Sequence, residues 1–157
     1  MGKTAVMGLL ERHGPDKVSR VKVSVVPTVR RRHLQAEIRQ HVEPGTQLYT
    51  DALKSYERLT DLYTHHVIDH AEAYAHGRIH TNGLENFWSL LKRAIKGTYV
   101  SVEPFHLFRY LDEQVFRFNS RKATDGSRFL AAARTVVGKR LTYKELIGAE
   151  MPALQTC

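Results

Sequence analysis

Two acidic side chains stand where they could hold metal ions. Asp51 ends the short segment 47–51, which is typical of a β-strand, and Glu85 lies in the first turn of a predicted amphipathic helix. In open α/β sheets, the carboxyl ends of strands line the crevice where ligands bind. Carboxylates from a strand end and a nearby helix could hold Mg²⁺, which prefers hard oxygen ligands. Two such ions, roughly 3.5–4 Å apart, would suit phosphodiester transfer.

Simpler interpretations of the same acids remain open on the pattern alone. Asp51 could cap a helix that follows it. Glu85 stands three residues after Asn82, which is the spacing of a capping box at a helix start. Lys92, seven residues after Glu85, shares its helix face and could reach a phosphate, although a lysine in such a place is usually only solvated.

The elements that would position these side chains follow from hydrophobic periodicity. Residues 3–12 and 18–26 predict a β-hairpin around the turn signal at 13–16, since the second segment alternates and is rich in valine. The chain then predicts, in order, a helix over 30–42, a strand over 47–51, a short helix over 52–62 with Leu53, Tyr56 and Leu59 on one face, and a strand over 65–69. A loop follows to about His80.

The pattern of the second half of the sequence predicts only helices. The best of them starts at Asn82, a good N-cap, and Gly97 is a plausible stop. Its apolar face consists of Leu84, Phe87, Trp88, Leu91 and Ile95, and its polar face of Glu85, Ser89, Lys92 and Lys96. A further helix is expected over 104–118, with Leu107, Leu111, Val115 and Phe118 in phase, and another from near Ser127. Residues 141–146 are expected to form a final turn or a short helix. The order of elements indicates a mixed α/β architecture.

Composition narrows the class of partner. The 157 residues carry a formal net charge of +8, which favours a polyanion such as nucleic acid, although a basic surface can also serve solubility alone. Arg30–Arg32 and the cluster Lys92, Arg93 and Lys96 are candidate phosphate contacts. A single cysteine, Cys157, excludes an internal disulfide and a cysteine zinc site. No apolar run could span a membrane and no signal peptide is present, so we expect a cytoplasmic protein.

Histidines gather in one stretch of the sequence: His65, His66, His70, His76 and His80. Some of their spacings suit a metal site, but no cysteine accompanies them. We interpret them as loop and core histidines, with His80 near the candidate carboxylates.

One stretch of the sequence resembles a known family. The run from His80 to Arg93 is similar to the helix that carries the third carboxylate of DDE-type bacterial insertion-sequence transposases, and the ISXO-like group is the nearest match. The resemblance continues through Gly97-Thr98-Tyr99, His106 to Glu113 and Phe116 to Arg121, and upstream through Tyr49-Thr50-Asp51 and Lys3 to Arg12. It covers nearly the whole chain and is most specific over residues 76–121.

The resemblance implies a fold, a chemistry and roles for individual residues. It implies a ribonuclease-H-like mixed sheet flanked by helices over 1–122, a C-terminal helical tail over 123–157, and Mg²⁺- or Mn²⁺-dependent cutting and joining of DNA ends. Asp51 would be the second metal-binding carboxylate and Glu85 the third. Lys92 would contact DNA near the reactive end, whereas Arg93 and Lys96 are candidate DNA contacts from their charge alone.

The sequence also departs from the family pattern. The first catalytic aspartate belongs on a central strand just before the hairpin, but this chain begins inside the hairpin. We therefore expect a sheet that lacks its first strand, two open strand edges that invite pairing with another chain, and a domain that is inactive alone. Glu11 or Asp69 could stand in for the missing acid.

A second function remains open. The chain could be a non-catalytic DNA-binding remnant in the nucleoid, or an inhibitor that pairs with an intact transposase or with itself. The sequence leaves open whether another segment supplies the missing strand.

Overall fold

The computed structural model describes residues 4–12, 18–68 and 82–148. The chain divides into two compact units, Met1–Asn119 and Ser120–Cys157. Within the described residues no helix is both long and apolar enough to cross a membrane. The mixture of strands and helices confirms the predicted α/β class.

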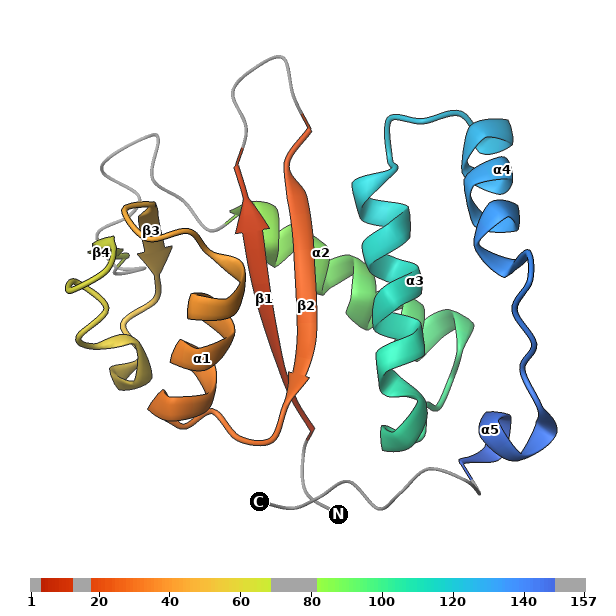
Figure 1. Cartoon of the computed structure of the whole chain (residues 1–157), viewed down its shortest axis with the longest axis horizontal. Coiled ribbons are helices and arrows are strands. Elements are labelled where there is room, and N and C mark those ends of the chain that lie inside the picture. Colours follow the sequence, from red (N-terminus) through yellow and green to blue (C-terminus); the bar gives the residue numbers. More distant parts are fainter. Residues whose placement is uncertain (1–3, 13–17, 69–81, 149–157) are drawn as a thin grey trace. The chain divides into compact units, whose positions relative to one another are not determined.

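The first unit is built on a β-hairpin that is covered on both faces (Figure 1). Strands β1 (Ala5–Glu11) and β2 (Arg20–Val26) pair in antiparallel register, from Ala5 opposite Val26 to Glu11 opposite Arg20. Side chains of β1 alternate between two cores: Met7 belongs to the core shared with helix α1, and Leu10 packs against the core of helices α2 and α3. The predicted hairpin is therefore confirmed, with its apolar residues divided between two faces.

Helix α1 (Arg31–His41) confirms the helix predicted over 30–42. Its apolar positions lie one turn apart, so Leu34 and Ile38 are both buried, together with Met7 of β1. Leu59 and Tyr63, from the segment after β3, complete this core. Helix α1 thus packs against both the hairpin and the segment that follows Asp51.

Strands β3 (Gln47–Thr50) and β4 (Thr64–Val67) form a second sheet, in parallel register. Among the described residues, β1 and β2 make one two-stranded sheet, and β3 and β4 make another. Both strands were predicted, and Asp51 follows β3 directly. Asp69, the proposed substitute acid, lies outside the described residues.

The helix predicted over 52–62 is wrong. Only the 3₁₀ turn η1 (Lys54–Tyr56) forms there, because Leu53 and Glu57 on either side of it have extended backbone angles. Arg58 then takes the left-handed value φ 65°, which an α-helix does not accommodate. Leu59 still reaches the core, but Leu53 is exposed.

Helix α2 (Asn82–Arg93) continues as the π-helical turn η3 (Ala94–Thr98). Its predicted apolar face is confirmed: Phe87 and Leu91 are buried beside Val21 of β2. Gly97 does not stop the helix as expected, because it lies inside the π-helical turn. The turn ends instead before Val100, whose φ of 61° is left-handed.

Helix α3 (Leu107–Asn119) follows the 3₁₀ turn η4 (Pro104–His106) and confirms the helix predicted over 104–118. Leu111 and Phe118 are buried, and the Phe118 ring meets the Phe87 ring edge-on at 5.5 Å between centroids. The helix ends at Asn119, whose side chain bonds to the backbone of β2. Helices α2 and α3 therefore cover the same face of the hairpin.

The second unit holds helices α4 (Asp125–Val136) and α5 (Tyr143–Ile147), near the two positions predicted from the sequence. Each begins at a threonine cap: Thr124 accepts a hydrogen bond from the Ser127 N–H, and Thr142 forms a capping box with Glu145. Local hydrogen bonds therefore define the starts of both helices.

Candidate active site

Asp51 and Glu85 both line one groove of about 1170 Å³. Residues of β1 and β3 line it, and the first two turns of α2 reach it through Leu84, Glu85 and Trp88. Both acids are exposed. The structure thus places the two sequence-predicted carboxylates on one groove.

Asp51 is positioned by the backbone that follows β3. Its Oδ1 accepts a hydrogen bond of 3.3 Å from the Leu53 N–H two residues along the chain, as in an Asx-turn. Tyr56 also lines the groove, and burial raises the pKa of Tyr56, with the negative charge of Asp51 adding to the effect. The charge of Asp51 therefore affects the pKa of Tyr56, although the helix predicted around Tyr56 does not form.

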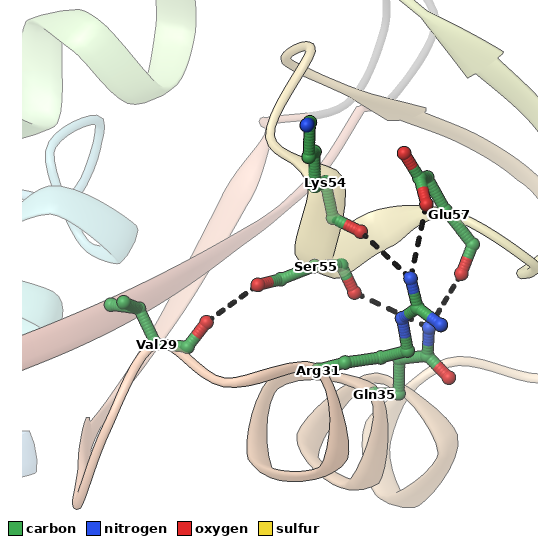
Figure 2. A network of polar contacts seen from close by, with 6 residues as sticks. All are labelled: Val29, Arg31, Gln35, Lys54, Ser55 and Glu57. Carbon is green, nitrogen blue, oxygen red and sulfur yellow. Dashed lines mark hydrogen bonds and ion pairs between the residues drawn. The ribbon is translucent and has the colours of Figure 1, made fainter.

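A polar network fixes the segment after Asp51 to α1 (Figure 2). The Arg31 guanidinium donates to Glu57 Oε2 at 3.0 Å and to the Lys54 carbonyl at 3.4 Å. The Gln35 amide donates to the backbone carbonyls of Glu57, at 2.8 Å, and Ser55, at 3.3 Å. Arg31, a candidate phosphate contact in the sequence, thus has a structural partner here.

Gln35 is the positioning residue that the sequence did not reveal. It is only 6% exposed, and its amide reaches the backbone carbonyls of Ser55, inside the 3₁₀ turn η1, and of Glu57, directly after it. A glutamine beside apolar positions looks like an ordinary polar neighbour in a helix pattern. The only hint in the sequence is indirect: the backbone carbonyls of the segment after Asp51 need hydrogen-bond donors, and Gln35 can donate to them.

Glu85 is positioned by a close approach of α2 to β1. A Cβ built on Gly8 would lie 2.6 Å from the Trp88 ring, and one built on Gly83 would lie 2.7 Å from Leu10. Because glycine has no side chain, the helix can lie directly on the strand at both points. The first turn of α2, with Glu85, is thereby held at the groove.

The three basic residues of the predicted DNA contact lie farther along the same helix. Lys92 and Arg93 are in the last turn of α2, Lys96 is in η3, and all three are exposed. None of them is among the described residues that line the groove. They form a basic stretch that begins two turns beyond Glu85.

The donor chemistry of the groove fits a hard divalent cation in part. Asp51 and Glu85 offer carboxylate oxygens, the ligands that Mg²⁺ and Mn²⁺ favour, and Glu11 also lines the groove. Within the described ranges, however, no three side chains among histidine, cysteine, aspartate and glutamate form a metal-binding group. Of the acids that line the groove, Asp51 and Glu85 are the two that the sequence predicts as ligands for such a cation.

The described histidines have structural contacts. His65 Nε2 lies 2.8 Å from the Thr50 hydroxyl, and burial lowers the pKa of His65, with neighbouring His66 adding to the effect. The His66 ring stacks on Tyr49 at 5.0 Å between centroids. These two histidines therefore join β3 to β4. His70, His76 and His80 lie outside the described residues.

Comparison with known proteins identifies the family. The chain matches the ISXO2-like transposase domain over residues 1–119. It is 33% identical over 102 residues to an uncharacterized transposase-like protein of Haemophilus influenzae, across 64% of this chain and 82% of that protein. No solved structure matches the chain significantly. The chain belongs to the ISXO2-like transposase family, which confirms the resemblance seen in the sequence.

Proposed function

We propose that this chain is catalytic-domain sequence of a DDE-type transposase, which cuts insertion-sequence ends and joins them to target DNA. Asp51 and Glu85 are two of its active-site carboxylates. The observation that carries this proposal is that both acids line one groove in a chain of the ISXO2-like transposase family. The family supplies the reaction class, and the groove supplies the residues.

The two carboxylates would act as ligands for Mg²⁺ or Mn²⁺. When bound, such ions supply activation of the attacking oxygen and stabilisation of the leaving one. Asp51 is anchored through Leu53 and η1, and Glu85 through the packing of α2 on β1. Both side chains are therefore held on fixed elements rather than on a free loop, as metal coordination requires.

DNA would be held mainly by its phosphates. Lys92, Arg93 and Lys96 are exposed on consecutive turns, so they could follow a phosphate backbone. Such contacts give affinity and position without choosing a base sequence. The formal net charge of +8 favours the same partner.

The direct test is metal binding, followed by chemistry. Mn²⁺ titrated into the ¹⁵N-labelled chain should broaden amide signals around Asp51 and Glu85, because its unpaired electrons relax nearby nuclei. Asp51→Asn and Glu85→Gln should each weaken this broadening. Any Mn²⁺-dependent cleavage or strand transfer of insertion-sequence-end DNA should fall on the order of a hundredfold in Glu85→Gln.

Glu103→Gln is the matched control. Glu103 is an exposed acid that does not line the groove, so its loss changes the net charge equally and should leave Mn²⁺ binding intact. Broadening centred elsewhere, or cleavage that survives both Asp51→Asn and Glu85→Gln, would reject the assignment of these carboxylates.

A non-catalytic DNA-binding function is the second candidate. It is favoured by the absence, within the described residues, of a group of three metal ligands. In that case the chain should shift DNA in a gel equally well with chelator and with Mn²⁺. DNA binding without Mn²⁺ binding would support this second function, and failure to shift DNA at low salt would reject it.

A further inference from the structure

We propose that Val100 is an apolar wedge that enters the base stack of DNA held by the basic stretch Lys92, Arg93 and Lys96. The inference rests on the proposed function, because it needs DNA at this stretch. It goes further by naming a residue that contacts bases rather than phosphates. The backbone angle of Val100, the anchoring of its neighbours, its exposure and its place in the chain support it.

Val100 has a backbone conformation that valine rarely adopts. Its φ of 61° lies in the left-handed region, where a residue branched at Cβ is strained. Among the described residues, the other positive φ values belong to Gly45, Gly138 and Gly148, which have no side chain to strain, and to the unbranched Arg58. A glycine or an asparagine would suit position 100 better if the turn alone mattered. Backbone strain of this kind gathers at functional sites.

The neighbours of Val100 hold it in this conformation. The Ser101 N–H donates to the Tyr99 carbonyl at 2.6 Å, which closes a three-residue γ-turn around Val100. The Tyr99 N–H donates to the Ala94 carbonyl at 3.0 Å, and the Tyr99 ring meets the Tyr110 ring at 4.6 Å between centroids. Because the turn is closed and its first residue is anchored to η3 and α3, Val100 is presented on a rigid support.

The side chain of Val100 lies in solvent rather than in a core. It is 81% exposed, more than any other large hydrophobic residue that the structure describes. Single exposed valines are common, and Val137 is 79% exposed with an ordinary φ of −60°. Val100 differs because its backbone is strained as well. Neither packing nor backbone preference explains a valine at this position, whereas a contact with a partner would.

The place of Val100 in the chain indicates the kind of partner. Lys92 and Arg93 end α2, Lys96 lies in the π-helical turn η3, and Val100 follows four residues after Lys96. A phosphate backbone that follows these exposed cations would bring DNA close to the γ-turn. The cores of protein–protein interfaces are depleted of lysine, so the neighbours of Val100 favour nucleic acid. Apolar side chains of DNA-binding proteins insert between base steps and partly unstack them.

The fluorescence of 2-aminopurine tests the proposal on the unaltered chain. The probe is a DNA duplex of alternating thymine and adenine, with 2-aminopurine in place of the adenines of one strand. TA steps unstack easily, and the repeat reports on every register of binding. Stacking quenches 2-aminopurine, so binding of the chain should raise the fluorescence. Val100→Asn should abolish this rise, because asparagine suits the left-handed angle but is polar. Val100→Ile, which keeps an apolar branched side chain, should retain it.

Two further measurements separate a wedge from a structural role and from a phosphate contact. Val100→Asn should raise the melting temperature by about 2–6 °C, because it relieves backbone strain. It should leave the slope of log K against log salt concentration unchanged, because valine binds no phosphate. Val137→Asn is the matched control: this valine is equally exposed but has no positive φ, so the melting temperature and the fluorescence rise should both stay as they are.

Failure of the wedge and failure of the proposed function give different results. An equal fluorescence rise with the original chain and with Val100→Asn would overturn the wedge and leave DNA binding intact. DNA binding without any rise in the original chain would also overturn it, and a dimer in sedimentation that Val100→Asn dissociates would then assign Val100 to a protein contact. No binding of the duplex at low salt would overturn the DNA-binding function together with the wedge.

Discussion

Tyr99 and Glu113 join the segment after α2 to α3 through one short hydrogen bond. The Tyr99 hydroxyl donates to Glu113 Oε2 at 2.6 Å, and the Arg117 Nε–H donates to Glu113 Oε1 at 2.9 Å. The hydrogen bond from Tyr99 is the main reason that the pKa of Glu113 lies below its ordinary value of 4.5, and the same bond raises the pKa of Tyr99 above 10.0. This bond fixes the chain directly after the basic stretch.

Tyr99→Phe should therefore raise the pKa of Glu113 toward 4.5. Because the pKa of Glu113 is lowered by folding, its stabilisation is present above pH 4.5 and is lost as the pH falls through the folded-state pKa. The variant should lose about 1 kcal/mol at neutral pH, and its stability should depend less on pH in the acid range. NMR titration of the Glu113 carboxyl checks the shift. Tyr110→Phe is the control, and an equal shift there would contradict the prediction.

At Asp51 the local hydrogen bond and the proposed cation-binding role do not compete. One carboxylate oxygen accepts the Leu53 N–H, while the other makes no hydrogen bond within the described residues. The bond from Leu53 orients the side chain, and the other oxygen could bind a cation. The helix cap that the sequence left open does not form, since only the 3₁₀ turn η1 follows Asp51 and its N-cap residue is Leu53.

At the scale of elements, the contact between β1 and α2 controls where Glu85 lies. Gly8→Ala would place a methyl group about where the Trp88 ring now lies, since the two atoms would be 2.6 Å apart. The ring is held in a packed core, so the substitution should destabilise the unit by about 1–3 kcal/mol. It should also shift the amide signals of Leu84 and Glu85.

Two further variants separate crowding from a general effect of alanine. Gly97→Ala introduces the same methyl group where no atom lies within 4 Å, and it should not be destabilising. Trp88→Leu should rescue part of the loss in Gly8→Ala, because the smaller side chain makes room, so the two changes should not be additive. Additive losses in denaturant unfolding would contradict the proposed contact.

The sequence predicted elements well where one periodicity dominated. Leu34 and Ile38 located α1, and Leu84, Phe87 and Leu91 located α2, because each set recurs once per turn on a buried face. The same spacing failed at Leu53, Tyr56 and Leu59. There the left-handed angle of Arg58 breaks the helix, and a side-chain pattern carries no signal for an unusual backbone angle at a non-glycine residue.

The residues of the candidate site and the elements that carry them could be predicted from the sequence. Their arrangement around one groove could not. Asp51 could be placed at a strand end and Glu85 in a first helical turn from local patterns. That they share a groove depends on the packing of Trp88 over Gly8 and on the network around Gln35. These contacts join residues far apart in the sequence, so their spacing gives no signal.

For DNA binding by the whole molecule, the distribution of charge over the surface matters more than the net charge. The formal net charge of +8 does not say which face meets a polyanion. Lys92, Arg93 and Lys96 are exposed near one another in the first unit, and Arg134, Lys139 and Arg140 are exposed in the second. The two groups carry the same charge, so they form a matched pair for a DNA-binding experiment.

Replacing Lys92, Arg93 and Lys96 by glutamine should weaken DNA binding and flatten its dependence on salt. Each lost phosphate contact should reduce the slope of log K against log salt concentration by about 0.9. The slope should thus fall by up to about 2.7 if all three residues bind phosphate. The same change at Arg134, Lys139 and Arg140 lowers the net charge equally, but it should leave most of the slope intact. Fluorescence anisotropy at several salt concentrations measures both variants. Equal slopes for the two would mean that net charge, rather than the basic stretch after Glu85, holds the DNA.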